Sequence, residues 1–250
     1  MGTPRVIVVE DDRELGRRGA DVVAGVLAAI PAAWVAVATG RSPLGMYAEL
    51  ADRRRTGLVD ASAITAVQLD EYLGVAPDDG PSLFGWMRRS FLEPLGVDAD
   101  RVVKLPLDGD IEAGCAAFDR TIAGHGGLDL AILGLGMNGH LGFNEPPADA
   151  DAPTRVVRLS STTLDDNAHY WGAGDRVPET AVTVGLRQLL GARRVLLVVS
   201  GTGKHAILRR ALEGAVGSDV PASFLQRAGA DVIVIADRTA WEGEGDTDSR

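Results

Sequence analysis

The chain has 250 residues, of which 46% are hydrophobic, enough for a substantial core in one large domain or two small ones. Its 35 acidic and 25 basic side chains give a net charge of -10, which disfavours nucleic acid as a partner and leaves no polybasic patch for a membrane surface. An anionic substrate must therefore be held by local positive groups, against the field of the whole chain.

The single cysteine, Cys115, excludes a disulfide within the chain and is expected to be a small buried apolar side chain. The N-terminal segment lacks the charged and apolar regions of a signal peptide, and no apolar run approaches the ~20 residues that a membrane helix needs. We therefore expect a cytoplasmic protein with no membrane partner.

Short apolar or β-branched runs recur along the chain. Most are continuously apolar rather than alternating, which is typical of strands buried on both faces. The predicted strands are residues 6–10, 34–39, 63–69, 102–106, 128–134, 194–200 and 231–237. Between them, apolar residues repeat at helical spacing. The predicted helices are residues 12–30, 43–57, 82–95, 109–124 and 204–216.

This alternation predicts an α/β fold: a doubly wound, mostly parallel sheet with helices on both faces, similar to the Rossmann arrangement. Residues 1–241 are expected to form a single domain, and the polar, acidic residues 242–250 a disordered tail. Ligands of such sheets bind beyond the carboxyl ends of the strands. Polar clusters that follow predicted strands are therefore the candidate site.

The first such cluster leads from the second predicted strand into a helix. It suits a phosphate, because a glycine lets the backbone approach closely and a helix N-terminus offers free N–H groups and a positive dipole end. The alternative is an ordinary turn, with a serine as N-cap and Pro43 at the first helical position. The residues at this junction are Thr39, Gly40, Arg41 and Ser42.

The second cluster ends the third predicted strand with two adjacent carboxylates, Asp70 and Glu71. A carboxylate at the carboxyl end of a strand can abstract a proton from a bound substrate. The alternative is a simple strand-ending turn.

The third cluster, "GMNGHLGFNEP", residues 136–146, places four polar side chains among glycines. His140 is the side chain best suited to move a proton at neutral pH. Glu145 could accept a hydrogen bond from the far ring nitrogen and fix its orientation, as the acid of a catalytic triad does. Asn138 could do the same more weakly. The alternative is a structural histidine in a polar loop.

The fourth cluster, "VVSGTGKHAI", residues 198–207, turns on two glycines, and Lys204 opens a helix. The phosphate-binding loop of nucleotide enzymes requires serine or threonine after the lysine, whereas this chain has His205, so no ATP site is predicted. A lysine at a helix start opposes the helix dipole, which an anion would relieve. The alternative is a solvated surface lysine.

Together the clusters resemble the glucosamine-6-phosphate deaminase (isomerase) family, over residues 34–237 and in the order of that family. The motif "LGLGMNGHLGFNEP" is very close to its signature, and "QLDEYLGV" and "TGRSPLGMY" match two further segments. "VPETAVTVGLRQLL" and "EGAVGSDVPASFLQ" are also similar to family sequences. No single segment is this specific, but the combination is.

The resemblance implies conversion of glucosamine 6-phosphate and water to fructose 6-phosphate and ammonia, with no cofactor and no metal. By the same resemblance, Asp70 is the base that moves a proton between C2 and C1. His140 opens the pyranose ring, with Glu145 and Asn138 beside it. Thr39, Gly40, Arg41, Ser42 and Lys204 hold the phosphate. The family includes monomers and hexamers, so a homo-oligomer stays open.

Three positions depart from the family pattern. Asn138 stands where many members have aspartate before the histidine, and His169 stands where the family usually has a phosphate-binding arginine. Only a protonated histidine could hold phosphate, and never with a bidentate fork. Members under allosteric control carry a basic pair, of which this chain keeps Arg155 but has Val157 for the lysine, so we expect no such control.

Three alternatives remain. The His169 change fits an enzyme for another aminosugar phosphate. A 6-phosphogluconolactonase usually has arginine after the acidic pair and a serine after the histidine, where this chain has Tyr72 and "GHLGFNEP". A non-catalytic sugar-phosphate sensor would need a DNA-binding module, for which the chain leaves no room before its first predicted strand.

Overall fold

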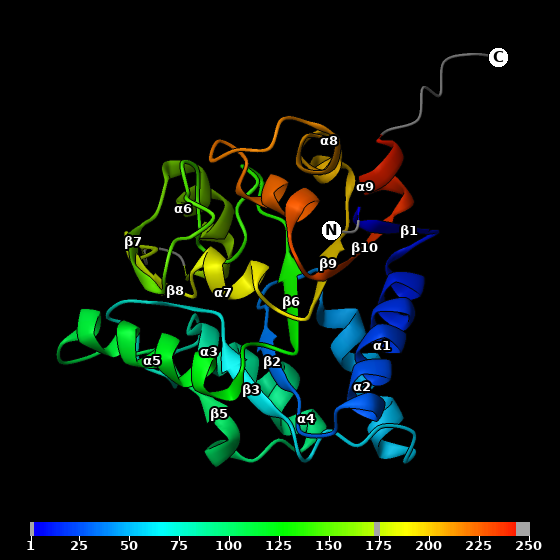
Figure 1. Cartoon of the computed structure of the whole chain (residues 1–250), viewed down its shortest axis with the longest axis horizontal. Helices are drawn as coiled ribbons and strands as arrows, with labels where there is room; N and C mark the ends of the chain where they lie inside the picture. Colours follow the sequence, from blue (N-terminus) through cyan, green and yellow to red (C-terminus); the bar gives the residue numbers. More distant parts are fainter. Residues whose placement is uncertain (1–2, 173–175, 244–250) are drawn as a thin grey trace.

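A computed structural model describes residues 3–172 and 176–243 (Figure 1). Its main sheet has seven strands in the order β1-β10-β9-β6-β2-β3-β5, and every neighbouring pair is parallel. The strands are β1 (Arg5–Val9), β2 (Trp34–Val37), β3 (Thr65–Gln68), β5 (Val102–Val103), β6 (Leu130–Gly134), β9 (Arg194–Val199) and β10 (Asp231–Asp237). All seven predicted strands are confirmed, as is the doubly wound, mostly parallel α/β fold.

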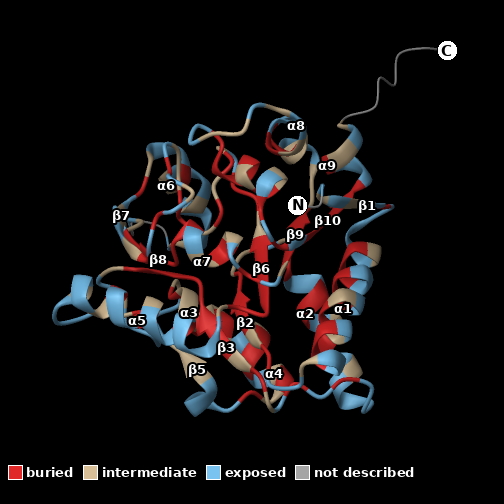
Figure 2. Cartoon of the chain, in the orientation of Figure 1, coloured by how far each residue is buried: buried red, intermediate tan, exposed pale blue. Residues whose placement is uncertain are grey.

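The central strands are buried on both faces, which is why their sequences are continuously apolar. In β9 every residue after Arg194 is buried, and β10 is buried from Val232 onward. Figure 2 shows these strands in the buried colour, while the flanking helices are buried on one side only. Burial of this apolar surface is the main favourable contribution to the stability of the fold.

Helices connect the strands and cover both faces of the sheet. They are α1 (Asp12–Ala29), α2 (Leu44–Arg55), α3 (Leu83–Met87), α4 (Glu93–Leu95), α5 (Ile111–His125), α6 (Ser161–Asn167), α7 (Leu186–Leu190), α8 (His205–Glu213) and α9 (Arg238–Glu242). The predicted helix 82–95 is divided, because a π-helix at Arg88–Leu92 separates α3 from α4. The predicted tail, 242–250, begins at the last residue of α9, and residues 244–250 lie outside the described residues.

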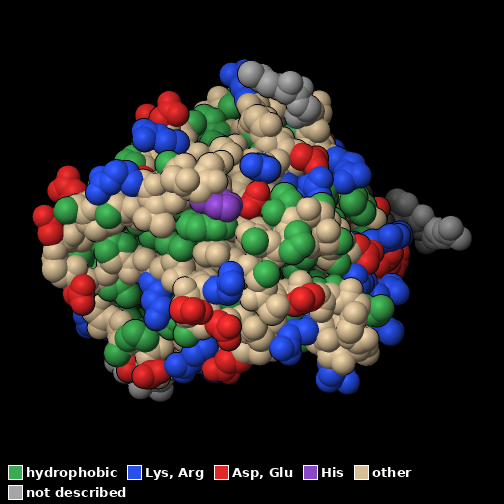
Figure 3. Space-filling view, turned by 60° about the horizontal axis from the view of Figure 1, so that its bottom comes forward, with side chains coloured by type: hydrophobic (Ala, Val, Ile, Leu, Met, Phe, Trp, Pro, Cys, Tyr) green, Lys and Arg blue, Asp and Glu red, His purple; other side chains and the backbone are tan. Residues whose placement is uncertain are grey.

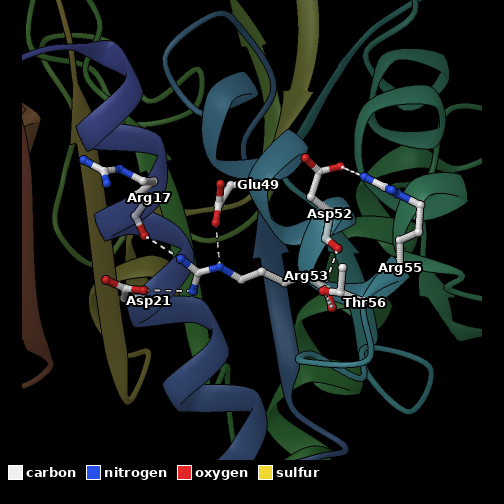
Figure 4. Close-up of polar contacts among 7 residues, drawn as sticks. All are labelled: Arg17, Asp21, Glu49, Asp52, Arg53, Arg55 and Thr56. Atoms are coloured by element: carbon white, nitrogen blue, oxygen red, sulfur yellow. Dashed lines mark hydrogen bonds and ion pairs between the residues drawn. The ribbon is translucent and has the colours of Figure 1, made fainter.

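Helices α1 and α2 cross closely, because glycines face each other at the crossing. A Cβ on Gly16 would lie 2.8 Å from the carbonyl carbon of Gly45, closer than packing allows. Arg53 of α2 fastens the crossing (Figure 4): its Nη1 lies 2.8 Å from Oδ1 of Asp21 on α1, and its Nε donates to Glu49 over 2.8 Å. This helix pair presents the N-terminus of α2 at the carboxyl edge of the sheet.

A second sheet, which sequence reasoning did not predict, has three antiparallel strands in the order β4-β8-β7. These are β4 (Asp70–Tyr72), β8 (Thr180–Thr183) and β7 (Arg155–Arg158). Asp70, predicted to end the third parallel strand, instead begins β4, where it pairs with Thr183. The strands are short and half polar, so they lack the long apolar runs by which the main sheet is recognised.

Within the described ranges, 3–172 and 176–243, no helix is long and apolar enough to cross a membrane. On the face of the molecule in Figure 3, acidic and basic side chains are interspersed.

Candidate active site

The four polar clusters meet at one edge of the main sheet. They follow β2, β3, β6 and β9, which are neighbours in the order β9-β6-β2-β3. The strands are parallel, so their carboxyl ends lie on the same side. After β2 the chain places β3 and β5 on one side of that strand, and it then returns to place β6, β9 and β10 on the other side. The clusters therefore surround the point between β2 and β6 where the strand order reverses. Ligands of open α/β sheets bind at such a point.

Asp70 is the most perturbed acid of this edge. Its side chain is 6% exposed, and its Oδ1 is buried without a hydrogen-bond partner among the described residues. Burial raises the pKa of Asp70 to about 7, and the neighbouring carboxylate of Glu71 adds to the rise, while the nearby Thr39 hydroxyl acts in the opposite direction. A carboxylate with this pKa and a free oxygen is suited to accept and return a proton near neutral pH.

Glu71 is buried as well, but its oxygens are already occupied. They accept hydrogen bonds from the Ser82 hydroxyl over 3.0 Å and from the backbone N–H groups of Leu83 and Phe84 over 3.0 and 2.8 Å. Glu71 therefore caps the N-terminus of α3, where a negative charge is favourable. Of the two adjacent carboxylates in the sequence, only Asp70 has a free oxygen for chemistry.

The loop 136–146 folds back on itself after β6. The Gly139 N–H donates to the Gly136 carbonyl over 3.0 Å, and the Gly136 N–H donates to the His140 carbonyl over 3.1 Å. Gly139 has φ +86°, a conformation that favours glycine. The Asn138 Oδ1 accepts from the backbone N–H of His140 over 3.2 Å. Asn138 therefore shapes the loop rather than contacting the imidazole as expected.

His140 carries a neutral imidazole. Burial lowers the pKa of His140, the charge of Glu145 opposes this and the positive charge of Lys204 adds to it, so that the pKa lies at about 4. The expected hydrogen bond between His140 and Glu145 is not formed: within the described residues, His140 Nδ1 and Glu145 Oε1 are both buried without partners. The other oxygen, Glu145 Oε2, accepts from the Ser160 N–H over 3.0 Å. Two polar groups are thus left available at the loop.

Lys204 lies in a 3-10 turn, Thr202–Lys204, that leads directly into α8, so the prediction that it opens a helix is confirmed. It is half-buried, and burial lowers its pKa, whereas the carboxylate of Asp166 raises it. Its positive charge also acts to lower the pKa of His140, so the clusters after β6 and β9 lie close enough to affect each other. A half-buried ammonium at this edge is well suited to an anion.

The cluster after β2 approaches the cluster after β9. The hydroxyls of Ser42 and Ser200 are 3.5 Å apart. Gly40 has φ +100°, and a Cβ there would meet nothing within 4 Å, so a ligand has open space beside it. Helix α2 begins at Leu44 with Pro43 as its N-cap residue and no side-chain cap, so the alternative of Ser42 as N-cap is wrong. Arg41 is exposed and Thr39 half-buried.

His169 is exposed, in the short 3-10 helix Ala168–Tyr170 that follows α6. Its ring lies against that of Tyr170, with 3.8 Å between the ring centroids. No described contact joins His169 to the other predicted site residues. Its segment nevertheless lies near two of the clusters: burial raises the pKa of Tyr170 while the charge of Arg41 lowers it, and the carboxylate of Asp166 in α6 raises the pKa of Lys204.

Two further residues join the site without having been predicted. Ser200 faces Ser42, as described above. Thr183 of β8 pairs with Asp70, and its hydroxyl accepts from the Phe143 N–H over 3.0 Å. Thr183 therefore ties the strand of Asp70 to the loop 136–146. Its sequence surroundings, "TAVTVG", carry no local signal for this role, because the pairing joins residues more than a hundred positions apart.

Other polar residues near the site are structural. Asn144 is fully buried, donates to the Leu141 and Val184 carbonyls over 2.8 Å each, and accepts from Arg155 over 2.8 Å. Among the described residues, no group of three or more His, Cys, Asp or Glu side chains is arranged to hold a metal ion.

Comparison with known proteins gives a consistent result. Residues 11–234 match the family model described as glucosamine-6-phosphate isomerases/6-phosphogluconolactonase. The glucosamine-6-phosphate deaminase of Cutibacterium acnes is 40% identical, with 94% of this chain and 90% of that protein covered. The deaminase of Halothermothrix orenii is 36% identical, with 94% and 98% covered.

Solved structures agree with these relatives. A structure described as a monomeric glucosamine-6-phosphate deaminase superposes with a TM-score of 0.90 at 34% identity, covering 94% of this chain and 98% of that one. The 6-phosphogluconolactonase of Trypanosoma brucei superposes with a TM-score of 0.75 at 20% identity, covering 96% and 98%, and shares the fold.

Proposed function

Because the chain belongs to the family of glucosamine-6-phosphate isomerases and 6-phosphogluconolactonases, we propose that it is a glucosamine-6-phosphate deaminase. It converts glucosamine 6-phosphate and water to fructose 6-phosphate and ammonia. The observation that supports this most strongly is Asp70, a buried carboxyl with a free oxygen and a pKa of about 7, at the same sheet edge as His140 and Lys204.

Ring opening comes first in the proposed mechanism. The closed sugar must lose the proton on O1 and gain one on O5, and a neutral imidazole can both accept and donate a proton. The lowered pKa of His140 keeps its imidazole neutral at physiological pH. Glu145, whose Oε1 is free among the described residues, stabilises the imidazolium that forms in passing.

Isomerisation follows in the open chain. The C2 proton is acidic because the C1 aldehyde is adjacent, and Asp70 takes it and returns it to C1. As the C2 amine gives up one N–H proton and the aldehyde oxygen O1 gains one to become a hydroxyl, C2 becomes an imine, which water hydrolyses to the ketone of fructose 6-phosphate, with release of ammonia. General acid–base steps of this kind contribute typically ~10²–10⁴-fold each.

The phosphate is held by the clusters after β2 and β9. Lys204 supplies the positive charge, while Thr39, Ser42 and the backbone of residues 40–42 donate hydrogen bonds. Arg41 adds a second positive charge from the loop. Binding the distant phosphate positions the reacting end of the sugar. His169 is a contributor only in its protonated form.

A second candidate is deamination of another 2-amino-hexose 6-phosphate. The observation that favours it is His169, exposed at the position where the resembling family usually has arginine. The same base and ring-opening residue would act on a different epimer.

The test is to incubate the protein with glucosamine 6-phosphate and with its galacto and manno isomers, and to measure ammonia and the ketose 6-phosphate. We expect turnover of the gluco compound. Turnover of another epimer alone would select the second candidate, and no turnover of any would reject both. 6-Phosphogluconolactone serves as the control substrate, and its hydrolysis in place of deamination would identify a lactonase.

A further inference from the structure

The imidazole of His140 lies flat against the backbone of Gly136. A Cβ built on Gly136 would overlap the Nε2, Cδ2 and Cε1 atoms of His140, well inside the 3.0 Å that real Cβ atoms essentially never breach. The three ring atoms are almost equally distant from that Cβ, which therefore stands over the face of the ring rather than beyond its edge. The ring occupies the space that any side chain at position 136 would fill.

The glycine is not required by the backbone at this position. Gly136 is absent from the glycines with positive φ, whereas Gly139 and Gly142 in the same loop have φ +86° and +58°. The left-handed conformation that favours glycine is therefore not the reason for a glycine at position 136. The three atoms nearest to a Cβ there all belong to the imidazole, which is therefore what an alanine side chain would meet first.

The backbone that carries His140 is held in place by its neighbours. The loop is closed beneath the ring by the Gly136 N–H to His140 carbonyl hydrogen bond, and Gly139 packs on Val220, whose Cγ1 would be 2.8 Å from a Cβ there. The Gly139 carbonyl also accepts from the Ala222 N–H over 2.8 Å. These contacts hold the backbone of the loop on two sides. A side chain at position 136 would therefore be accommodated by rotation of the His140 ring away from it.

We propose that Gly136 is a positioning residue for His140: the missing side chain lets the imidazole lie flat on the backbone and holds it where it transfers the ring-opening proton. The proposal rests on the proposed function of His140. Restoring ordinary van der Waals distance to a methyl group would displace the ring by roughly 1 Å or more. A misplacement of that size in a catalytic group costs about 10²-fold in rate.

The first experiment is Gly136→Ala. We expect kcat on glucosamine 6-phosphate to fall about 10²-fold. Affinity for an acyclic analogue, 2-amino-2-deoxyglucitol 6-phosphate, should stay within about twofold, because that compound needs no ring opening and contacts the same phosphate site. The matched control is Gly25→Ala, at an exposed position of α1, where a Cβ meets nothing within 4 Å. A Gly136→Ala enzyme within threefold of wild type would overturn the proposal.

The second experiment is a double-mutant cycle with His140→Ala, which empties the space over residue 136. If Gly136 acts through the imidazole, Gly136→Ala should lower kcat and Tm in the wild type but change neither when His140 is already alanine. Equal losses in both backgrounds would overturn the proposal. If Gly136→Ala alone does not fold, recovery of folding in the double variant supports the contact, and failure to recover rejects it.

The experiments distinguish a failure of the proposed function from a failure of the positioning role of Gly136. If the wild type turns over no aminosugar phosphate, the proposed function is lost, while the Tm cycle still tests whether the imidazole excludes a side chain at 136. If the wild type is active and Gly136→Ala is equally active, only the positioning role is lost.

Discussion

The two sheets of this protein differ in what their strands contain, and Asp70, the proposed base, lies within a strand of the small one. The strands of the seven-stranded sheet are mostly buried apolar residues, whereas β4 of the three-stranded sheet consists of the buried Asp70, Glu71 and Tyr72. Within the described residues, none of the buried side-chain atoms without a hydrogen-bond partner belongs to a strand of the large sheet. These atoms belong to Asp70, Arg88, His140, Glu145, Thr163, Trp171 and His205.

The difference teaches where this fold accepts unfavourable groups. A buried polar atom without a partner is destabilising by about 1–3 kcal/mol. Such atoms lie in the small sheet, in loops and in helices, while the large sheet supplies the apolar burial that offsets them. Substitutions should therefore separate: those in the small sheet and loops change turnover, and those in the large sheet change stability.

The largest effect is expected for Asp70→Asn. The amide cannot accept the C2 proton, so kcat should fall about 10³-fold, within the range of general base catalysis. Substrate affinity should stay nearly unchanged. Exchange of the C2 proton with deuterated solvent measures the step directly, and Asp100→Asn, at an exposed position, is the control. Exchange at the wild-type rate in Asp70→Asn would exclude Asp70 as the base.

The pH dependence is the next largest effect. Because Asp70 acts as a base with a pKa of about 7, kcat/KM should fall about tenfold per pH unit below that value. His140, with a pKa of about 4, should add no second limb near pH 6.5. A profile that is flat from pH 5 to 8 would contradict the assignment.

The same pKa predicts a change in stability. Since the pKa of Asp70 is raised above its unfolded value, the folded state binds more protons between about pH 4 and pH 7. The contribution of Asp70 to the free energy of unfolding is therefore lost as pH rises through this window. Asp70→Asn should remove that loss, so the variant should gain stability relative to wild type at pH 8 but not at pH 4. Urea titrations at both values measure it.

A substitution in the large sheet should do the reverse. Leu197 in β9 is fully buried, and Leu197→Ala should lower the free energy of unfolding by about 2–5 kcal/mol through lost contacts and a cavity. The kcat of the folded fraction should not change. Leu58→Ala, at a side chain that is 77% exposed, is the matched control and should change neither. A large fall in kcat for fully folded Leu197→Ala would contradict the expectation that substitutions in the large sheet change stability and not turnover.

Glu71→Gln should change both the stability of the protein and the pH dependence of its turnover, because Glu71 bonds to α3 and also neighbours Asp70. Losing the charge that accepts from Ser82, Leu83 and Phe84 should cost about 1–3 kcal/mol of stability. It also removes the negative neighbour that helps to raise the pKa of Asp70, so the acidic limb of kcat/KM should move to lower pH. An unmoved limb would show that burial alone sets the pKa of Asp70.

The smallest effect is expected for His169→Arg. An arginine at this exposed position could add a charge-assisted hydrogen bond to the substrate phosphate, and partial solvation limits its value. KM should fall by about fivefold, equivalent to ~1 kcal/mol, with kcat unchanged. A KM that does not change would indicate that Arg41 and Lys204 already hold the phosphate fully.

Much of the large sheet could be predicted because its strands are buried on both faces and therefore read as unbroken apolar runs. The clusters that follow them could be predicted to converge because parallel strands end at one edge. The three-stranded sheet could not, because β7 alternates half-buried and exposed residues over only four positions and β4 is polar in sequence although buried in the structure. Residue chemistry alone did not separate Asp70 from Glu71, since both are carboxylates and adjacent in the chain, and only the family resemblance singled out Asp70 as the base.

The sequence by itself determined the order of strands and helices, the polar groups at their ends and the family, because periodicity and residue type are local properties. Only the tertiary structure decided the ionisation and the hydrogen-bond partners of these groups. Burial leaves Asp70 with a pKa of about 7 and His140 neutral, and the N–H groups at the N-terminus of α3 donate hydrogen bonds to Glu71. The ionisation of a side chain depends on what surrounds it, and here those surroundings come from segments far apart in the chain.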